Sequence, residues 1–260
     1  MTATDFAFLD HPGPLAFAHR GGAGDWPENS LPAFEGAAAL GYCYVETDVH
    51  VTADGVLLAF HDDHLERVTD RTGCIADLPY SAVREARIDG REPIPLLADL
   101  LGSFPSLRFN IDPKHDRCLD ALVEVIERTG SVDRVCCGAF SDRRLDLLRA
   151  RLGPRLCTSL GPKGTARLRA AAYGLPGGGG LKAPCAQVPT HIKGRTLVDE
   201  RFVKAAHDRG IQVHVWTIDD RAEMDRLLDL GVDGIMTDRP AVLKQVLQER
   251  DRWSGSEDGP

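Results

Sequence analysis

Residues 15–48 read LAFAHRGGAGDWPENSLPAFEGAAALGYCYVETD and contain the pattern that decides the fold. The stretch begins with an apolar, strand-like run at Leu15–His19, continues through a helix-like segment at Leu31–Leu40, and ends with a second strand-like run at Tyr44–Asp48. Strands that alternate with helices pair in parallel, because the helix returns the chain to the same end of the sheet. The stretch therefore predicts one β-α-β unit.

The rest of the chain repeats this alternation. Further strand-like runs lie at Leu107–Asp112, Arg134–Ala139, Arg155–Leu160, Leu181–Val188, Ile211–Trp216 and Val232–Met236. The clear helical segments between or after them are Cys118–Arg128, Arg143–Arg151, Asp199–Arg209, Arg221–Leu230 and Ala241–Arg250. Eight such units in ~250 residues predict an α/β fold, a closed (β/α)8 TIM barrel. An open doubly wound sheet is the alternative, but no G-x-G-x-x-G fingerprint follows the first strand.

One interval in this repeat is too long. From Tyr44 to Leu107 the chain takes about twice the usual length of a unit. The excess, roughly residues 61–95, is polar and contains three prolines. We expect a single TIM-barrel domain over residues 1–251, with this insertion capping the barrel mouth, and a disordered polar tail at residues 252–260.

Composition excludes several classes of protein. Hydrophobic residues make up 43% of the 260 and charged residues 27%, so the chain can bury a core and stay soluble. A net charge of −8 argues against nucleic acid or an anionic membrane as a general partner. No run of 18 apolar residues occurs, and the first residues lack the features of a secretory signal. We therefore expect no stable membrane association.

The cysteines indicate a reducing environment. There are seven of them, an odd number, and no C-x-x-C spacing occurs. Most lie in apolar runs, where free cysteine behaves as a small hydrophobic residue. We expect a cytoplasmic protein without a disulfide framework or a zinc site. The sequence marks no subunit interface and leaves the oligomeric state open.

Polar side chains follow the predicted strands where a TIM barrel places its catalytic groups, at the C-terminal ends. His19 and Arg20 end the first strand. Glu46 and Asp48 end the second, and they share one face because they are two residues apart. Together with a returning His61, this is a set of acid, base and cation groups suited to metal-assisted phosphate-ester chemistry.

The third strand adds another carboxylate, Asp112, with Lys114 just beyond it. Three carboxylates that converge need a cation, because like charges raise one another's pKa. Ligands that are all oxygen suit Mg²⁺, Ca²⁺ or Mn²⁺ better than Zn²⁺. Glu46, Asp48 and Asp112 are therefore the predicted metal ligands.

A hairpin is expected to bring His61 to this site. Asp54-Gly55 is a strong signal for a two-residue turn. With that loop, residues whose numbers add to 109 face each other, so Asp48 would face His61. A bulge would shift this pairing.

The motifs that carry these residues resemble the glycerophosphodiester phosphodiesterase family, which belongs to the phosphatidylinositol-phospholipase-C-like barrels. In order they are HRGG at 19–22, PENS at 27–30, ETDV at 46–49, TADG at 52–55, HD at 61–62, NIDPK at 110–114, VWT at 215–217 and GVDGIMTDRP at 231–240. The resemblance covers nearly the whole chain. It departs from the family at Asp112, where a Glu is frequent, and the shorter side chain leaves the choice of metal open.

The resemblance implies metal-dependent hydrolysis of glycerophosphodiesters to glycerol 3-phosphate and an alcohol, a reaction of lipid and glycerol metabolism. His19 and His61 would act as general base and general acid on opposite sides of the phosphorus, which suits their unperturbed pKa near 6.5. Arg20 and Lys114 would clamp the phosphate. Two routes stay open: water attacks phosphorus directly, or a glycerol hydroxyl attacks first through a cyclic intermediate.

Other residues have two interpretations each. Trp216 ends the seventh strand and would form a wall for glycerol or a choline group, or else pack in the core. Asn29 would contact phosphate or metal, or else help cap the next helix. Asp62 would orient His61 or belong to a surface turn. Asp238 is expected to cap a helix, and His50 to lie at the rim of the site.

Two other functions are considered. A lysophospholipase-D-like or sphingomyelinase-D-like activity would need an apolar entry surface, whereas the predicted insertion is rich in Asp, Glu and Arg. A non-catalytic barrel that serves as a binding module usually lacks a catalytic histidine or acid, and this chain has both histidines and all three acids.

Overall fold

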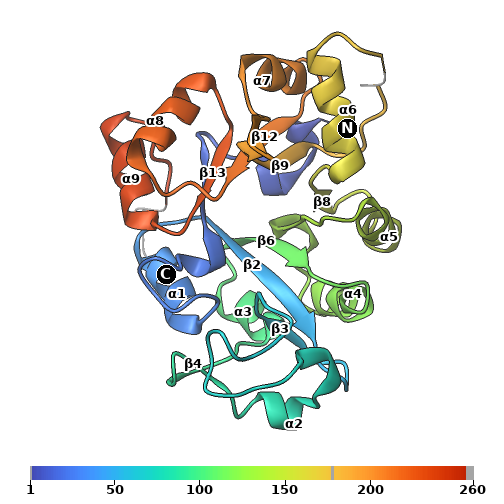
Figure 1. Ribbon diagram of the computed structural model, residues 1–260, viewed down its shortest axis with the longest axis vertical. Helices are drawn as coiled ribbons and strands as arrows, with labels where there is room; N and C mark the ends of the chain where they lie inside the picture. Colours follow the sequence, from blue (N-terminus) through green and yellow to red (C-terminus); the bar gives the residue numbers. More distant parts are fainter. Residues whose placement is uncertain (1, 177–178, 256–260) are drawn as a thin grey trace.

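The computed structural model describes residues 2–176 and 179–255, which form a nearly closed barrel of parallel strands (Figure 1). Its strands in the described residues are β1 (Leu15–Ala18), β2 (Tyr44–Val51), β6 (Arg108–Pro113), β7 (Val135–Cys137), β8 (Cys157–Thr158), β9 (Cys185–Pro189), β12 (Gln212–Trp216) and β13 (Gly234–Thr237). They pair in the order β8-β7-β6-β2-β1-β13-β12-β9, and a parallel bridge between Ser159 and Cys185 links the two outer strands. The predicted TIM barrel is confirmed.

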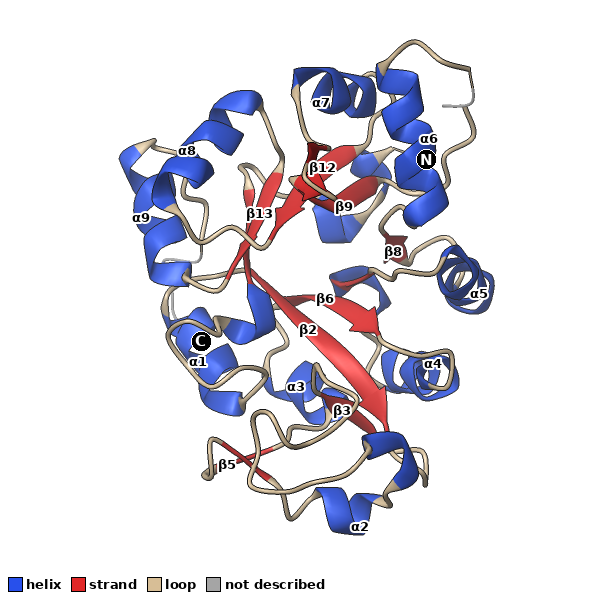
Figure 2. Cartoon of the chain, in the orientation of Figure 1, coloured by secondary structure: helices blue, strands red, loops and turns tan. Residues whose placement is uncertain are grey.

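Helices surround these strands (Figure 2). They are α1 (Leu31–Ala39), α4 (Cys118–Arg128), α5 (Asp142–Leu152), α6 (Pro162–Ala172), α7 (Glu200–His207), α8 (Arg221–Leu230) and α9 (Pro240–Glu249). Every predicted helix is present, with ends within two residues of the prediction. Helix α6 was not predicted, because Leu168 is its one fully buried side chain and leaves a weak apolar pattern.

The predicted strands are too long on the far side of the barrel. A strand is predicted over Arg155–Leu160, whereas β8 spans only Cys157–Thr158, and β9 begins at Cys185 rather than at Leu181. Arg155 is an exposed residue that forms an ion pair with Asp133. The apolar residues next to these two strands therefore lie in loops. Hydrophobic periodicity alone does not distinguish such loop residues from the ends of a strand.

The long connection between β2 and β6 forms a lobe beside the barrel, drawn below β2 in Figure 1. It contains β3 (Leu57–Ala59), α2 (Tyr80–Val83), β4 (Arg87–Ile88), β5 (Glu92–Pro93) and α3 (Leu97–Ser103). It has an apolar core of its own, made of Leu58, Phe60, Leu65, Ile75, Val83, Ala86, Ile88 and Ile94. The sequence predicts a polar insertion here, because the apolar residues of this core are too scattered along the chain to indicate long strands or helices.

The hairpin between β2 and β3 has a different register from the predicted one. Val49 pairs with Ala59 and Val51 with Leu57, and the Phe60 amide donates to the Asp48 carbonyl oxygen at 2.9 Å. The two residue numbers of each observed pair add to 108, whereas the prediction required 109. The expected pairing of Asp48 with His61 is therefore wrong by one residue. The loop has three residues rather than two, and Gly55 lies at its end with a φ of 89°, which suits glycine.

The barrel is closed at the N-terminal ends of its strands by the segment that precedes β1. Phe8 packs edge-on against Tyr44 with ring centroids 5.3 Å apart, and Phe17 lies 5.1 Å from the same ring. The Tyr44 hydroxyl donates to the Phe8 carbonyl oxygen at 2.8 Å. With this end filled, the polar residues that follow the strands lie at the opposite end.

The described end of the chain contacts the barrel. Trp253 packs edge-on against Tyr42, with ring centroids 5.2 Å apart. Disorder of residues 252–260 stays a prediction. Residues 256–260 lie outside the described residues. No helix in the described chain is long and apolar enough to cross a membrane.

The packing predicts a large loss of stability when Phe109 in β6 is replaced by alanine. Phe109 is completely buried in the main apolar core. We expect Phe109→Ala to lower the free energy of unfolding by about 3–5 kcal/mol, because a cavity remains where the ring was. Urea denaturation would measure this. Phe140→Ala is the control, since that ring is 71% exposed and its loss should cost little.

Candidate active site

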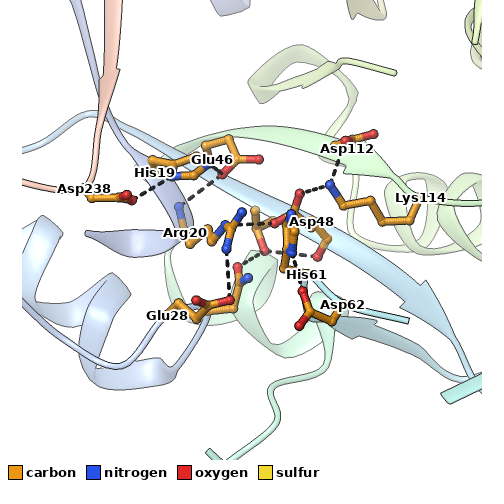
Figure 3. Close-up of polar contacts among 12 residues, drawn as sticks. His19, Arg20, Glu28, Glu46, Asp48, His61, Asp62, Asp112, Lys114 and Asp238 are labelled. Carbon is orange, nitrogen blue, oxygen red and sulfur yellow. Dashed lines mark hydrogen bonds and ion pairs between the residues drawn. The ribbon is translucent and has the colours of Figure 1, made fainter. Parts of the chain in front are cut away.

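The predicted site residues meet where β1, β2 and β6 end (Figure 3). His19 and Arg20 lie in a tight turn directly after β1, in which Arg20 has a φ of 51°. Asp48 in β2 pairs with Asp112 in β6, so the two carboxylates lie on neighbouring strands. Gly21 continues the turn with a φ of 80°, and any Cβ there would lie 2.7 Å from the Ala33 side chain. The turn thus holds the first loop close to α1.

His19 is held by two carboxylates. Its Nδ1 lies 2.7 Å from an Asp238 oxygen, and its Nε2 lies 3.7 Å from a Glu46 oxygen. Burial opposes protonation of the ring, but Glu46 and Asp238 outweigh it and raise the pKa of His19 above its usual value. Asp238 does not cap α9, contrary to the sequence prediction, because that helix has Arg239 at its N-cap.

His61 has a similar arrangement on the other side of the site. Its Nδ1 lies 2.6 Å from an Asp62 oxygen, as one of the two interpretations of Asp62 predicted. Arg67 from the lobe binds both Asp62 and Glu28, with Nε 2.5 Å from Asp62 and Nη2 2.6 Å from Glu28. The hydrogen bond from Arg67 lowers the pKa of Asp62 to about 2. Arg67, which the sequence analysis missed, therefore joins the lobe to the loop after β1.

Two buried donors point to an anion at this site. Arg20 donates from Nη1 to Glu28 at 3.1 Å, whereas its buried Nε makes no hydrogen bond within the described chain and has only a 3.4 Å ion-pair contact with Asp48. The Asn29 side-chain oxygen accepts from Thr47 at 2.7 Å, whereas its buried Nδ2 likewise lacks a partner in the described residues. An unpaired buried donor is costly, so each is suited to an oxygen of a bound ligand.

Asn29 does not cap the following helix. The neighbouring Ser30 does so, since its side-chain oxygen accepts from the Ala33 amide at 3.4 Å. Asn29 instead has a φ of 55° and is completely buried. Of its two interpretations, the structure is compatible with the ligand contact.

The carboxylates form a buried, crowded group. Burial, reinforced by the neighbouring Asp48, raises the pKa of Glu46 to about 7. Burial also raises the pKa of Asp112, although Lys114 offsets part of this. The Lys114 ammonium lies 2.5 Å from Asp48 and 3.0 Å from Asp112 and partly neutralises both. Arg20 is a second cation here, with Nε 3.4 Å from the other oxygen of Asp48, so three carboxylates face two cationic side chains.

The donor set fits a divalent cation. The second oxygen of Asp48 is buried and makes no hydrogen bond within the described residues, although it lies 3.4 Å from Arg20 Nε in an ion pair. This oxygen can still offer a lone pair to a cation. Three carboxylates are hard oxygen ligands of the kind that Mg²⁺ and Ca²⁺ prefer. The oxygens of these three carboxylates do not all lie within 4.8 Å of one another, a distance that other groups of potential ligands in the described residues do meet. Binding of one cation would therefore draw the three carboxylates closer together than they are in this structure.

Trp216 lies at the C-terminal end of β12, where it is half-buried and packs against the apolar cluster that contains Phe17 and Tyr44. Its ring packs edge-on against Phe140, with centroids 5.8 Å apart. Phe140 is 71% exposed and was missed by the sequence analysis, because it follows a short strand without any motif. The two rings form an apolar edge on this end of the barrel.

Comparison with known proteins agrees with this geometry. The profile of the Glycerophosphoryl diester phosphodiesterase family matches residues 19–242. The chain is 38% identical to the probable glycerophosphodiester phosphodiesterase 2 of Mycobacterium tuberculosis, with 96% of each chain covered.

Solved structures share the fold. One from Silicibacter pomeroyi has a TM-score of 0.80 at 24% identity and covers 95% of this chain and 98% of that chain. Another is a phosphodiesterase from Oleispira antarctica in complex with the product sn-glycerol-3-phosphate, with a TM-score of 0.77, 23% identity, and 91% and 97% of the two chains covered. On its matching profile and its mycobacterial relative, this chain belongs to the glycerophosphoryl diester phosphodiesterase family.

Proposed function

We propose that the protein hydrolyses glycerophosphodiesters to glycerol 3-phosphate and an alcohol. The observation that carries this proposal is the pair of histidine–aspartate contacts, His19 with Asp238 and His61 with Asp62. In each pair the carboxylate accepts from Nδ1, so Nε2 is left to take or give a proton. The relative from M. tuberculosis and the product-bound structure from O. antarctica support the same reaction by their names.

The two histidines divide the proton transfers. His19 is the general base that takes the proton from the attacking hydroxyl group. His61 is the general acid that gives a proton to the leaving alcohol. Each nearby aspartate fixes the orientation of its ring and stabilises the imidazolium form.

Cationic and amide groups bind the phosphate. Arg20 Nε and Asn29 Nδ2 are buried donors that make no hydrogen bond within the described residues, and both can donate to phosphate oxygens. Lys114 adds a positive charge from the end of β6. These contacts stabilise the negative charge that grows on the phosphoryl oxygens during attack.

Glu46, Asp48 and Asp112 would hold one divalent cation, Mg²⁺, Ca²⁺ or Mn²⁺. When bound, it would supply Lewis-acid polarisation of a phosphoryl oxygen. The chain's own part is to place the three carboxylates on neighbouring strands, with an Asp48 oxygen that makes no hydrogen bond within the described residues.

A lipid substrate is the second candidate. The exposed Phe140 beside Trp216 gives the site an apolar edge that the sequence analysis did not foresee. An acyl chain of a lysophospholipid would contact such an edge, and so would the methyl groups of choline. The leaving group therefore decides between a glycerophosphodiesterase and a lysophospholipase-D-like enzyme.

The deciding experiment measures phosphate-ester products from a substrate panel. The panel contains glycerophosphocholine, glycerophosphoethanolamine, glycerophosphoglycerol and lysophosphatidylcholine. Release of glycerol 3-phosphate from the first three supports the proposal. Turnover of lysophosphatidylcholine alone would move the lipid activity to first place, and turnover of none of them would contradict both.

Asp238 is expected to set the pH dependence through His19. Asp238 helps to raise the pKa of His19, so Asp238→Asn should lower it. A general base works when deprotonated, so the acid limb of the kcat/KM profile should move to lower pH. We also expect kcat/KM at its plateau to fall about 10²-fold, because the ring is less well oriented.

The control for this variant is Asp89→Asn, which removes an exposed carboxylate of the lobe. This control variant should leave both the acid limb and the plateau of the kcat/KM profile unchanged. An Asp238→Asn profile that coincides with that of the wild type would show that Asp238 does not act through His19.

A further inference from the structure

A second group of metal-ligating side chains lies beside the candidate active site. His50 comes from the end of β2, Asp63 from the loop after β3, and His115 from the loop after β6. One ligand atom from each lies within 4.8 Å of the other two. These residues are distant in sequence, so the tertiary structure brings them together.

The distances suit a single cation. His115 Nε2 lies 2.9 Å and His50 Nε2 lies 3.7 Å from the same Asp63 oxygen. Ligands at about 2.1 Å from a zinc ion are separated from one another by roughly 3.0–3.4 Å, depending on coordination geometry. The two measured separations lie just below and just above this range. Small rotations of exposed side chains would therefore bring the ligands to an ion.

The charge states suit a cation as well. His50 is 2% exposed, and an imidazole in its neutral form has a lone pair to offer an ion. Asp63 contacts both histidines and supplies the carboxylate of the group. The ammonium of the neighbouring Lys114 is paired with Asp48 and Asp112.

We propose that His50, Asp63 and His115 form a binding site for a divalent transition-metal ion, separate from the three-carboxylate site. Two imidazoles and one carboxylate are ligands that suit zinc or a similar ion better than Mg²⁺ or Ca²⁺. The side chains of Asp63 and His115 are 56% and 46% exposed, so an ion can enter and water can complete its coordination. His50 was expected at the rim and is instead buried, which fixes one ligand firmly.

The site is connected to the catalytic loop. His50 Nε2 lies 3.0 Å from the carbonyl oxygen of His61 and donates a hydrogen bond to it. A metal ion on this nitrogen would replace that proton, so the imidazole must carry its hydrogen on Nδ1 and the bond to His61 is lost. Asp63 follows His61 by two residues and would be drawn toward the ion. Occupation of the site should therefore displace His61 and inhibit the enzyme, a consequence that rests on the proposed function.

The test compares zinc binding by the whole protein and its His115→Ala variant. Both are treated with EDTA, then titrated with Zn²⁺ by calorimetry in excess Mg²⁺, which occupies the three carboxylates. We expect zinc to bind the variant about 10²-fold more weakly than the wild type, because loss of a direct ligand should cost at least as much as loss of an outer contact. His191→Ala is the matched control, since it removes an exposed histidine of the two-residue strand β10 (His191–Ile192) and should bind as the wild type does. Equal zinc affinity in the His115→Ala and wild-type proteins would overturn the proposal.

Cobalt distinguishes this site from a group of thiols. The buried Cys136, Cys157 and Cys185 also have sulfur atoms within 4.8 Å of one another. Co²⁺ bound to thiolates has strong charge-transfer absorption in the near ultraviolet, whereas Co²⁺ on His50, Asp63 and His115 has only weak visible bands. Thiolate absorption as the main signal would overturn the proposal. The weak bands, absent in His115→Ala, would support it.

Activity provides a second readout. Zn²⁺ should inhibit release of glycerol 3-phosphate by the wild type and inhibit His115→Ala much less, with equal basal turnover. Inhibition that is the same in both proteins would contradict the link to His61. If the wild type has no turnover, the proposed function fails, while the calorimetric and cobalt measurements still decide the metal site.

Discussion

Replacing His19 with alanine should lower kcat/KM for release of glycerol 3-phosphate by about 10²–10⁴-fold. The His19 ring lies 2.7 Å from Asp238 and 3.7 Å from Glu46, and alanine offers no atom that can take a proton. The same loss is expected for His61→Ala, which removes the proton donor on the other side. Steady-state kinetics with the best substrate of the panel would measure both variants.

The two losses should not add. If the histidines act as a unit, the double variant should be little worse than either single one. His191→Ala serves as the control, because it removes an exposed histidine from β10. Wild-type turnover by both His19→Ala and His61→Ala would refute the catalytic assignment and return the non-catalytic barrel to consideration.

Removal of the proposed cation should lower turnover about as much as loss of either histidine does. EDTA treatment should stop the reaction, and Mg²⁺, Ca²⁺ or Mn²⁺ should restore it in the wild type. Glu46→Gln should not be restored by any of them, because a neutral amide is a much poorer ligand than a carboxylate. Glycerol 3-phosphate release and metal content after dialysis would be measured together.

The Tm of Glu46→Gln shows whether the variant has lost only a metal ligand or has also misfolded. Glu46 is buried among carboxylates, and burial raises its pKa to about 7. Removing this charge should leave the Tm of the metal-free protein unchanged or higher, since an uncompensated buried charge is costly. A lower Tm for Glu46→Gln would point to misfolding, and full turnover after EDTA would exclude the metal from the mechanism.

The barrel and the polar ends of its first strands could be predicted from local patterns. The β-α-β alternation depends on residues close in sequence, and the parity of Glu46 and Asp48 follows from the period of a strand. The family motifs then predicted that His19 and Lys114 belong to the same site. The roles of these residues stay predictions until the kinetic experiments are done.

Other features depended on contacts between distant residues. The one-residue error in the hairpin came from loop length, because a three-residue loop and a two-residue loop share the same Asp-Gly signal. Asp238 looked like a helix cap in sequence, yet its carboxylate binds a histidine 219 positions earlier. Arg67 had no motif, and only the folded lobe places it between Asp62 and Glu28.

By itself, the sequence determined the order of strands and helices, the family and the kinds of groups at the barrel mouth. These depend on periodicity and composition, which act over a few residues. The tertiary structure decided which carboxylate holds each histidine, which donors stay unpaired, and that His50, Asp63 and His115 converge. Such contacts depend on how whole elements pack, since side chains far apart along the chain meet only when the barrel and its lobe have formed.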